Sequence, residues 1–337
     1  MRAPLRILIA AASCAVFAAG AMAGEAVKEC RGSDMLAEMA TKDAATHDKI
    51  VAEAAKLENA SALLFKVEKS GVAPSYLFGT IHLSDTRVST VPSKAAEAFN
   101  TAKALVLEVA DLSPNAMTAA MIGGGADTLV YSDGRSLSGE LTPDEFAKVK
   151  DLMHASGMPG ELAGVIRPWL VSTLLSVSDC ERAQTAAGKP VLDMHLAQMA
   201  KARGIPVLGL ETIQEQLAAM SGVPEDQQIQ MLKVGLKYTD RTDDLMETML
   251  QFYLKRQMGA AIPFQLALAE KAGVPAAAFE GFQKKLLVDR NVKMLAGAKP
   301  IFDKGGAFIA VGGLHLPGKT GLVALLREAG YTVTPAE

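Results

Sequence analysis

Two short segments near opposite ends of the chain share one pattern, an apolar run followed by Gly-x-x-His and then Leu. The segments are Tyr76–Leu83 and Phe308–Leu316, and their histidines are His82 and His315. Each apolar run is typical of a buried β-strand, so each histidine should lie at or just past the carboxyl end of a strand. The pattern therefore predicts one sheet built from both ends of the chain. Both imidazoles should lie at the edge where α/β sheets bind ligands.

Six short apolar runs are candidates for the strands of this sheet. Several of them are continuously apolar, as expected for strands that are covered on both faces. The chain has 337 residues, 50% of them hydrophobic, which is enough for one large domain or two small ones. We expect an α/β fold with a mixed central sheet. The candidate strands are Leu63–Val67, Tyr76–Leu83, Ala104–Val109, Pro206–Leu210, Ala307–Gly312 and Tyr331–Thr334.

Between the strand candidates, most of the sequence carries helical signals. Thr142–Glu145 is a capping box with proline at the first helical position. Gly204 and Gly330 each end a helical segment that leads directly into a strand candidate. We expect a large helical insertion, roughly residues 112–188 and 220–296, that covers a single α/β domain of residues 24–337.

The N-terminus has the three parts of a secretory signal peptide, which we assign to residues 1–23. Arg2 and Arg6 are basic, Ile7–Phe17 is apolar, and Ala21–Ala23 is an A-x-A cleavage site. We expect cleavage after Ala23 and a periplasmic or secreted protein. No later run reaches the ~18 apolar residues that a membrane span needs, so we expect no integral membrane span. The net charge of −3 favours neither a nucleic acid nor an anionic membrane surface as a partner.

Cleavage at that position leaves Cys30 and Cys180 as the two cysteines of the mature chain. In an oxidising compartment, two cysteines most simply form one disulfide, which would tie the N-terminal arm to a helix in the middle of the chain. Two free thiols are the alternative. The chain has no Cys-x-x-Cys pair, so a thiolate zinc site is excluded.

The two histidines of the repeated pattern can serve as metal ligands or as a general base near pH 7. The glycine three residues before each of them, Gly79 or Gly312, lets the backbone or a ligand approach closely because it has no Cβ. One Gly-x-x-His is a weak signal, whereas two that each follow an apolar strand indicate a metal or hydrolytic site. The alternative is that both histidines are satisfied residues of the core or of turns.

Two glutamates should lie at the same edge of the sheet. Glu108 ends the third strand candidate inside an apolar run, and Glu211 directly follows the fourth. A buried glutamate is costly unless it is paired or bound to a cation. Glu211 has an alternative interpretation as the first acid of the next helix. Arg290 and Asn291 lie late in a helix, where Arg290 could stabilise an oxyanion, pair with a glutamate, or lie on a solvated helix face.

The remaining histidines and one further motif have simpler interpretations. We expect His195 to be structural and His47 and His154 to be exposed, and Asp111 to lie on the surface.

Gly313–Thr320 fits the phosphate-binding pattern Gly-x4-Gly-Lys-Thr. The few residues that follow it cannot supply the further strands and the second acidic motif of a nucleotide-hydrolysing domain. We therefore reject nucleotide binding.

Taken together, these segments resemble the TraB/GumN family, which is related to the Tiki proteases. The likeness runs from about Cys30 to the end of the chain. It implies an α/β fold in which two Gly-x-x-His motifs share one site with glutamate and arginine. Tiki proteases are described as divalent-metal-dependent peptidases, and similar folds occur in erythromycin esterases and a haem-binding lipoprotein. The resemblance rests on Tyr76–His82, Leu107–Glu108, Val207–Thr212, Glu215–Leu217, Asp289–Asn291 and Val311–Leu316.

The residues and the resemblance together favour a secreted metal-dependent hydrolase of the peptidase type. His82 and His315 would be metal ligands, with Glu108 or Glu211 completing the site. Zn²⁺, Mn²⁺ or Co²⁺ suits such a donor set. The other glutamate would act as general base, and Arg290 would stabilise the oxyanion. The substrate would be a peptide or another small polar molecule.

Two other functions stay open. In a metal-free hydrolase of the esterase type, His82 or His315 would be the base and a glutamate would orient it. In a non-catalytic periplasmic binding or assembly protein, the cleft would hold haem or another ligand. Activity that survives chelation would indicate the first of these functions, and a visible absorbance band would indicate the second.

Overall fold

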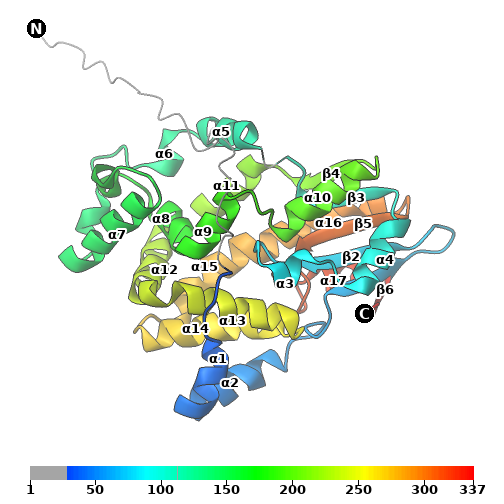
Figure 1. Ribbon diagram of the computed structural model, residues 1–337, viewed down its shortest axis with the longest axis horizontal. Coiled ribbons are helices and arrows are strands. Elements are labelled where there is room, and N and C mark those ends of the chain that lie inside the picture. Colours follow the sequence, from blue (N-terminus) through cyan, green and yellow to red (C-terminus); the bar gives the residue numbers. More distant parts are fainter. Residues whose placement is uncertain (1–28, 112) are drawn as a thin grey trace, which may run out of the picture.

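The computed structural model describes residues 29–111 and 113–337. The expected signal peptide and its cleavage site after Ala23 lie outside the described residues. Within the part that is described, no helix is long and apolar enough to cross a membrane. The strands gather in one sheet on one side of the molecule, and helices extend away from it on the other (Figure 1).

A six-stranded mixed sheet with strand order β4-β3-β5-β2-β1-β6 forms the centre of the fold (Figure 1). Strands β4, β3, β5 and β2 are parallel neighbours, whereas β1 pairs antiparallel with both β2 and β6. The predicted mixed sheet built from both ends of the chain is therefore confirmed. The strands are β1 Leu64–Glu68, β2 Ser75–Thr80, β3 Ala104–Val109, β4 Val207–Glu211, β5 Ala307–Gly312 and β6 Thr332–Pro335.

One strand ends earlier than the sequence predicts. We expected the second strand to continue to Leu83, but β2 ends at Thr80. The backbone N–H of Leu83 donates to the carbonyl of Ile81 at 2.9 Å, and this tight turn takes the chain out of the sheet. His82 therefore lies on a loop beyond the carboxyl end of β2.

Helices fill the long connections between β3 and β4 and between β4 and β5 (Figure 1). The predicted capping box is present, with Thr142 at the start of α7, and Gly204 and Gly330 follow their helices with positive φ. The grouping of the connecting helices into one insertion stays a prediction. The helices before β4 are α1 Met35–Lys42, α2 Ala44–Ala54, α3 Thr86–Ser89, α4 Ser93–Thr101, α5 Pro114–Gly123, α6 Ala126–Leu129, α7 Pro143–Ala155, α8 Pro168–Leu175, α9 Asp179–Ala186 and α10 Leu192–Ala202.

The connection between β4 and β5 contains a π-helical segment, Lys284–Val288, that runs directly into α16. Such segments interrupt the regular helical hydrogen bonding and are frequent at functional sites. The helices after β4 are α11 Ile213–Ser221, α12 Glu225–Lys237, α13 Thr242–Leu254, α14 Ala261–Lys271, α15 Glu280–Gln283, α16 Asp289–Phe302 and α17 Leu322–Glu328. Short 3₁₀ turns occur at Leu137–Gly139, Gly160–Gly164, Thr239–Arg241, Met258–Ala260, Ala276–Phe279 and Gly313–His315.

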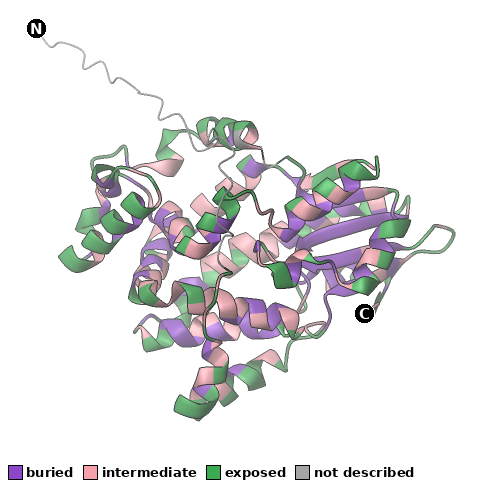
Figure 2. Ribbon diagram, viewed as in Figure 1, coloured by how far each residue is buried: buried purple, intermediate pink, exposed green. Residues whose placement is uncertain are grey.

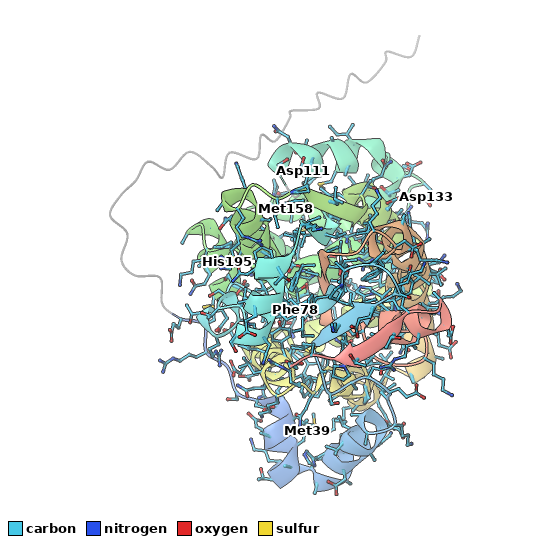
Figure 3. The ribbon with its side chains drawn as sticks, turned by 90° about the vertical axis from the view of Figure 1, so that its right-hand side faces the viewer. Met39, Phe78, Asp111, Asp133, Met158 and His195 are labelled. Atoms are coloured by element: carbon cyan, nitrogen blue, oxygen red, sulfur yellow. A yellow bond between two sulfur atoms is a disulfide. The ribbon has the colours of Figure 1, made fainter. Side chains whose placement is uncertain are left out.

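The two faces of the sheet carry separate hydrophobic clusters, because successive side chains of a strand point to opposite faces. Phe78, Leu105 and Phe308 pack on one face with residues of α4, α10, α13 and α14. Leu77 and Ile309 pack on the other face with residues of α16 and α17. Figure 2 shows the buried strands between helices whose outer surfaces are exposed, and Figure 3 places Phe78 in the middle of the molecule.

The edge strand β4 is less covered than the sequence suggests. Its apolar run favoured a strand covered on both faces, but Leu208 is 41% exposed. β4 pairs only with β3, so its outer edge has no neighbouring strand among the described residues.

A disulfide joins Cys30 to Cys180, with a Cα–Cα distance of 5.5 Å. The expected pairing is therefore confirmed. It links the segment before α1 to α9, across a sequence separation of 150 residues.

Gly79 in β2 lies where the segment that follows β5 packs against the sheet. A Cβ at this position would lie 2.7 Å from Leu316 Cδ1 and 3.1 Å from Gly313 Cα. The carbonyl of Gly79 also accepts a hydrogen bond from the hydroxyl of Tyr253 at 2.9 Å. The close contact between β2 and the segment that carries His315 therefore depends on the absence of a side chain at Gly79.

We predict that Gly79→Ala lowers the free energy of unfolding by about 1–3 kcal/mol, because the added methyl group overpacks this contact. Urea denaturation measures the change. Gly139→Ala is the matched control, since a Cβ there meets nothing within 4 Å. Equal losses in the two variants would contradict the packing argument.

Candidate active site

Four parallel strands deliver the predicted site residues to one edge of the sheet. His82 follows β2, and Glu108 is the next-to-last residue of β3. Glu211 is the last residue of β4, and His315 lies in the 3₁₀ turn that follows β5. Because the carboxyl ends of parallel strands meet at the same edge, residues far apart in sequence are brought together there.

The centre of this cluster is the space above Gly312. A Cβ built on that glycine would lie 3.2 Å from Glu108 Oε1, 3.6 Å from His315 Cδ2 and 3.8 Å from His82 Nε2. The imidazoles from the two ends of the chain therefore meet around a single point, together with one carboxylate. Any side chain larger than hydrogen at this position would occupy the space that the three groups share.

His315 is buried, and Asn291 fixes its orientation. Its Nδ1 is 2.6 Å from Asn291 Oδ1, and the amide NH₂ of Asn291 donates to the carbonyl of Thr320 at 2.8 Å. Oδ1 of Asn291 can only accept, so we assign the ring proton of His315 to Nδ1. Burial lowers the pKa of His315 to about 4. At neutral pH the ring is therefore uncharged and presents the lone pair of Nε2, as a metal ligand must.

Glu108 divides its two carboxylate oxygens between two sets of partners. Oε1 accepts the backbone N–H of Gly312 at 2.7 Å and lies 3.7 Å from Nε2 of His315. Oε2 accepts hydrogen bonds from Arg290 at 2.7 Å and from Gln216 at 3.0 Å. Burial alone would raise the pKa of Glu108. The neighbouring imidazoles, the guanidinium and the Gly312 N–H outweigh burial and lower this pKa to about 2.

Arg290 binds both glutamates. Its Nη2 donates to Glu108 and to Glu211 at 2.7 Å each, and its Nε donates to the two oxygens of Glu211 at 3.2 and 3.1 Å. The remaining nitrogen, Nη1, donates to the carbonyl of Leu286 in the π-helical segment at 3.3 Å. Of the alternatives for Arg290, the geometry favours pairing with the glutamates. A solvated helix face is wrong, because the side chain is 15% exposed.

The position of Arg290 within its helix also differs from the prediction. We placed it late in a helix, but it is the second residue of α16, directly after the π-helical segment. The side chain of Glu211, its main partner, is 1% exposed. Both oxygens of Glu211 are occupied by the guanidinium, and Gln216 also donates to Oε2 at 3.3 Å.

His82 has a different environment from His315. Its side chain is 60% exposed, and its Nδ1 is 2.9 Å from Oδ2 of Asp193, a buried residue in the first turn of α10. Oδ1 of Asp193 accepts a hydrogen bond from the hydroxyl of Thr80 at 2.8 Å, which fixes the carboxylate. The charge of Asp193 outweighs desolvation and raises the pKa of His82 to about 9.

The chemistry of the donor set fits a divalent metal ion. His315 Nε2 and Glu108 Oε1 are 3.7 Å apart, close to the ~3.4 Å between two ligands of a tetrahedral ion with bonds of ~2.1 Å. Both atoms are acceptors, so a cation between them would be attracted to each. Among the described residues, no group of three or more His, Cys, Asp or Glu is arranged to hold an ion. A third bond from His82 therefore needs a shift of its ring.

Sequence reasoning missed two polar groups that surround the histidines and assigned no role to a third. Asp193 holds the ring of His82, Thr80 donates to Asp193, and Gln216 bridges the two glutamates. An acid in the first turn of a helix is expected from the helix dipole alone, so nothing local distinguishes Asp193. Gln216 belongs to a segment that carries the family resemblance, which is the one signal that could have identified it.

The other histidines lie outside the cluster. His195 is half-buried on α10, and His154 is exposed, as expected. His47 was expected to be exposed, but its side chain is only 27% exposed, and its Nδ1 lies 2.9 Å from Oδ1 of Asp48. Asp111 is exposed and lies near the outer end of the molecule (Figure 3).

An apolar groove of about 790 Å³ lies beside the site. It is lined by α2, α14, the π-helical segment and the loop after β5, and it includes Asn291, Leu314 and Thr320. None of His82, Glu108, Glu211, Arg290 or His315 lines it. The groove therefore reaches the residue that orients His315 without containing the charged cluster itself.

Comparisons with known proteins found a family and several curated relatives that this chain resembles. The model of the TraB/PrgY/gumN family matches residues 63–335. Metalloprotease TIKI2 of Danio rerio is 25% identical over 306 residues, which cover 77% of this chain and 58% of the relative. Metalloprotease TIKI1 of Homo sapiens is 24% identical over 309 residues, which cover 78% of this chain and 60% of the relative. The chain thus spans about three fifths of the length of these curated relatives. No solved structure matches it significantly.

We predict that His82 titrates with a pKa of about 9 in the metal-free protein and that Asp193→Asn lowers this pKa toward ~6.5, because the substitution removes the charge that raises it. NMR titration of the ring nitrogens measures both values.

The folded-state pKa of His82 lies above the unfolded one, so the His82–Asp193 pair stabilises the fold fully below pH ~6.5 and loses this effect as the pH rises through about 9. Asp111→Asn, at an exposed position, is the control, and an unchanged pKa in Asp193→Asn would contradict the assignment.

We also predict that Gly312→Ala abolishes binding of Zn²⁺ at the cluster while the fold is retained. The added Cβ would stand 3.2 Å from Glu108 Oε1 and fill the shared space, whereas the backbone of Gly312, with φ −52° and ψ 135°, accepts alanine without strain. Isothermal titration measures binding, and circular dichroism measures folding. Gly139→Ala is again the control. Parent-like affinity in Gly312→Ala would show that the ion binds elsewhere.

Proposed function

On the premise that the chain belongs to the TraB/PrgY/gumN family, which the match over residues 63–335 shows, we propose that it is a metal-dependent hydrolase of the peptidase class. The single observation that carries the proposal is the meeting of His82, His315 and Glu108 around the space above Gly312. The names of the curated relatives, which are metalloproteases, support the same class of reaction.

In this proposal His315, Glu108 and His82 would hold a divalent ion such as Zn²⁺, Mn²⁺ or Co²⁺. The ring of His82, whose pKa is raised to about 9, would release a proton when it binds the ion. When bound, such an ion supplies Lewis-acid polarisation of a carbonyl and acidifies a water molecule. Asn291 keeps Nε2 of His315 free of its proton, and the Gly312 N–H holds Oε1 of Glu108 toward that nitrogen. The ligand role of Glu108, rather than Glu211, is supported by the orientation of its Oε1.

Glu211 and Arg290 receive roles that differ from the initial expectation. Glu211 is enclosed by the guanidinium, so we assign it to anchoring Arg290 rather than to general-base catalysis. Arg290 in turn holds Oε2 of Glu108 and thereby orients the carboxylate. Every nitrogen of the guanidinium already has an acceptor, which argues against a primary role in stabilising an oxyanion.

A peptide is the substrate class that the surroundings support best. The neighbouring groove has largely apolar walls, including Ile262, Leu266 and Leu287, which suit an apolar side chain of a peptide.

Export to the periplasm or the cell exterior is supported by the composition of residues 1–23 and by the disulfide, which oxidising compartments favour.

A metal-free hydrolase is the second candidate function, and one observation favours it. The pair of His82 and Asp193 has the geometry of a general base oriented by a carboxylate, with Nε2 of His82 facing the same shared space. Because the pKa of His82 is raised to about 9, this ring would act as a base at alkaline pH, where it is uncharged. The orienting acid is an aspartate on α10, not one of the glutamates that the sequence suggested.

We predict that His315→Ala and Glu108→Gln each weaken Zn²⁺ binding at least ~10-fold and abolish metal-supported peptide cleavage, because each variant loses one donor of the site. Isothermal titration measures affinity, and a fluorogenic peptide library measures cleavage. His195→Ala, on α10 outside the cluster, should leave both unchanged. Cleavage that persists after chelation, with the metal content verified as zero, would reject the metal-dependent reaction in favour of the His82–Asp193 base.

A further inference from the structure

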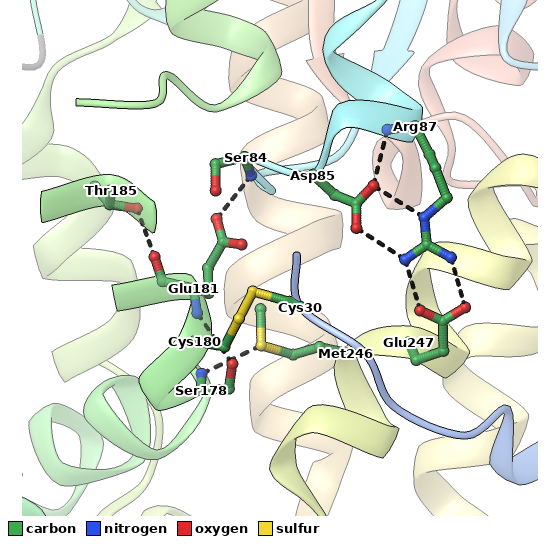
Figure 4. The surroundings of a disulfide bond; sticks show 10 residues. All are labelled: Cys30, Ser84, Asp85, Arg87, Ser178, Cys180, Glu181, Thr185, Met246 and Glu247. Atoms are coloured by element: carbon green, nitrogen blue, oxygen red, sulfur yellow. Dashed lines mark hydrogen bonds and ion pairs between the residues drawn. A yellow bond between two sulfur atoms is a disulfide. The ribbon is translucent and has the colours of Figure 1, made fainter. Parts of the chain in front are cut away.

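The loop that carries His82 is held by a buried carboxylate from a distant helix. The backbone N–H of Ser84, two residues after His82, donates to Oε1 of Glu181 at 2.7 Å (Figure 4). Both residues are buried, with exposures of 3% for Ser84 and 5% for Glu181. A buried backbone N–H needs an acceptor, and the Glu181 oxygen at 2.7 Å supplies it, so this contact fixes the path of the loop.

Glu181 occupies a rigid place in α9. It directly follows Cys180, which the disulfide binds to Cys30. Its backbone N–H donates to the hydroxyl of Ser178 at 3.2 Å, and its carbonyl accepts from Thr185 at 3.0 Å (Figure 4). The carboxylate that reaches Ser84 therefore extends from a backbone that a covalent bond and a helix cap hold in place.

The other half of the disulfide is anchored on α13. After Cys30, the backbone N–H of Ser33 donates to Asp244 at 2.6 Å, and that of Met35 donates to Thr248 at 2.8 Å. The segment Cys30–Met35 thus couples α9 to α13 through the disulfide.

The same α13 also holds the far end of the His82 loop. Glu247 of α13 accepts two hydrogen bonds from Arg87 of α3, at 2.9 and 2.7 Å. Arg87 also binds Asp85, the residue that caps α3 (Figure 4). The loop is therefore clamped on one side by Glu181 and on the other by Glu247, and the disulfide connects the helices that carry these two acids.

We propose that Glu181 is a positioning residue for His82 and that the Cys30–Cys180 disulfide serves the active site through it. The inference rests on the proposed function, in which His82 acts at the cluster. Without the carboxylate, the N–H of Ser84 becomes a buried donor without its acceptor, and the loop must move to satisfy it. A displacement of about 1 Å in a reacting group can lower a rate 100-fold, so a loop shift of this kind moves His82 out of reach.

The first test compares Glu181→Leu with Glu181→Gln, which keeps an oxygen that can accept from Ser84. In Glu181→Leu we expect a changed ¹⁵N signal of His82 Nδ1 in the metal-free protein and Zn²⁺ affinity reduced about 10-fold. Glu181→Gln should restore the His82 signal and keep the affinity within about threefold of the parent's. Thr142→Ala, which removes the capping box of α7, is the control for a general loss of stability and should change neither readout.

The second test removes the disulfide with Cys30→Ser/Cys180→Ser in the full chain. This double variant should shift the same His82 signal as Glu181→Leu. Combined with Glu181→Leu it should add little further effect, because both changes act through one contact. If Glu181→Leu does not fold, the double cysteine variant alone tests whether this contact positions His82.

Three results would overturn the proposal: a parent-like His82 signal in Glu181→Leu, Glu181→Gln behaving as Glu181→Leu does, or additive effects of the disulfide and Glu181 variants. Failure of the proposed function is seen separately. If the parent protein binds no Zn²⁺ and cleaves no peptide, the metal site is wrong. The His82 signal in the metal-free variants still decides whether Glu181 positions the ring.

Discussion

The bridge that Arg290 makes between Glu108 and Glu211 is the interaction on which the rest of the candidate site depends. Two carboxyl groups lie at the buried ends of neighbouring strands, and each is costly to bury without a partner. A planar guanidinium can donate to both at once and leave one oxygen of Glu108 directed toward His315. The ion pair thus stabilises the ends of β3 and β4 and sets the orientation of the acid nearest the histidines.

The two Gly-x-x-His segments are alike in sequence and unlike in their surroundings. His315 is enclosed and held by the neutral amide of Asn291, so burial keeps it uncharged. His82 is open to solvent and held by the carboxylate of Asp193, which favours its charged form. The difference comes from the helix that contacts each ring, which is α16 for His315 and α10 for His82. Two similar motifs therefore provide one fixed, neutral imidazole and one basic, accessible imidazole.

Much of the fold could be predicted because apolar runs are visible in the local sequence and because general rules govern how parallel strands pair. The runs around Phe78 and Phe308 identified central strands, and parallel pairing then required Glu108, Glu211 and both histidines to share an edge. The contacts of Asp193 and Gln216 could not be predicted in the same way. They depend on how α10 and α11 pack against the sheet, which no short pattern encodes. The role of Arg290 stayed undecided for the same reason, since its partners come from β3 and β4.

The position of β5 has a consequence for how the chain acquires its structure. This strand lies between β2 and β3, yet it is the next-to-last strand in the sequence. Until Ala307–Gly312 joins the sheet, the facing edges of β2 and β3 each carry an unsatisfied row of amide and carbonyl groups. Exposed strand edges readily pair with other molecules, and pairings across long stretches of sequence form slowly. We therefore expect the chain to be most prone to aggregation before β5 inserts between β2 and β3, and a chaperone to have its greatest effect at that stage.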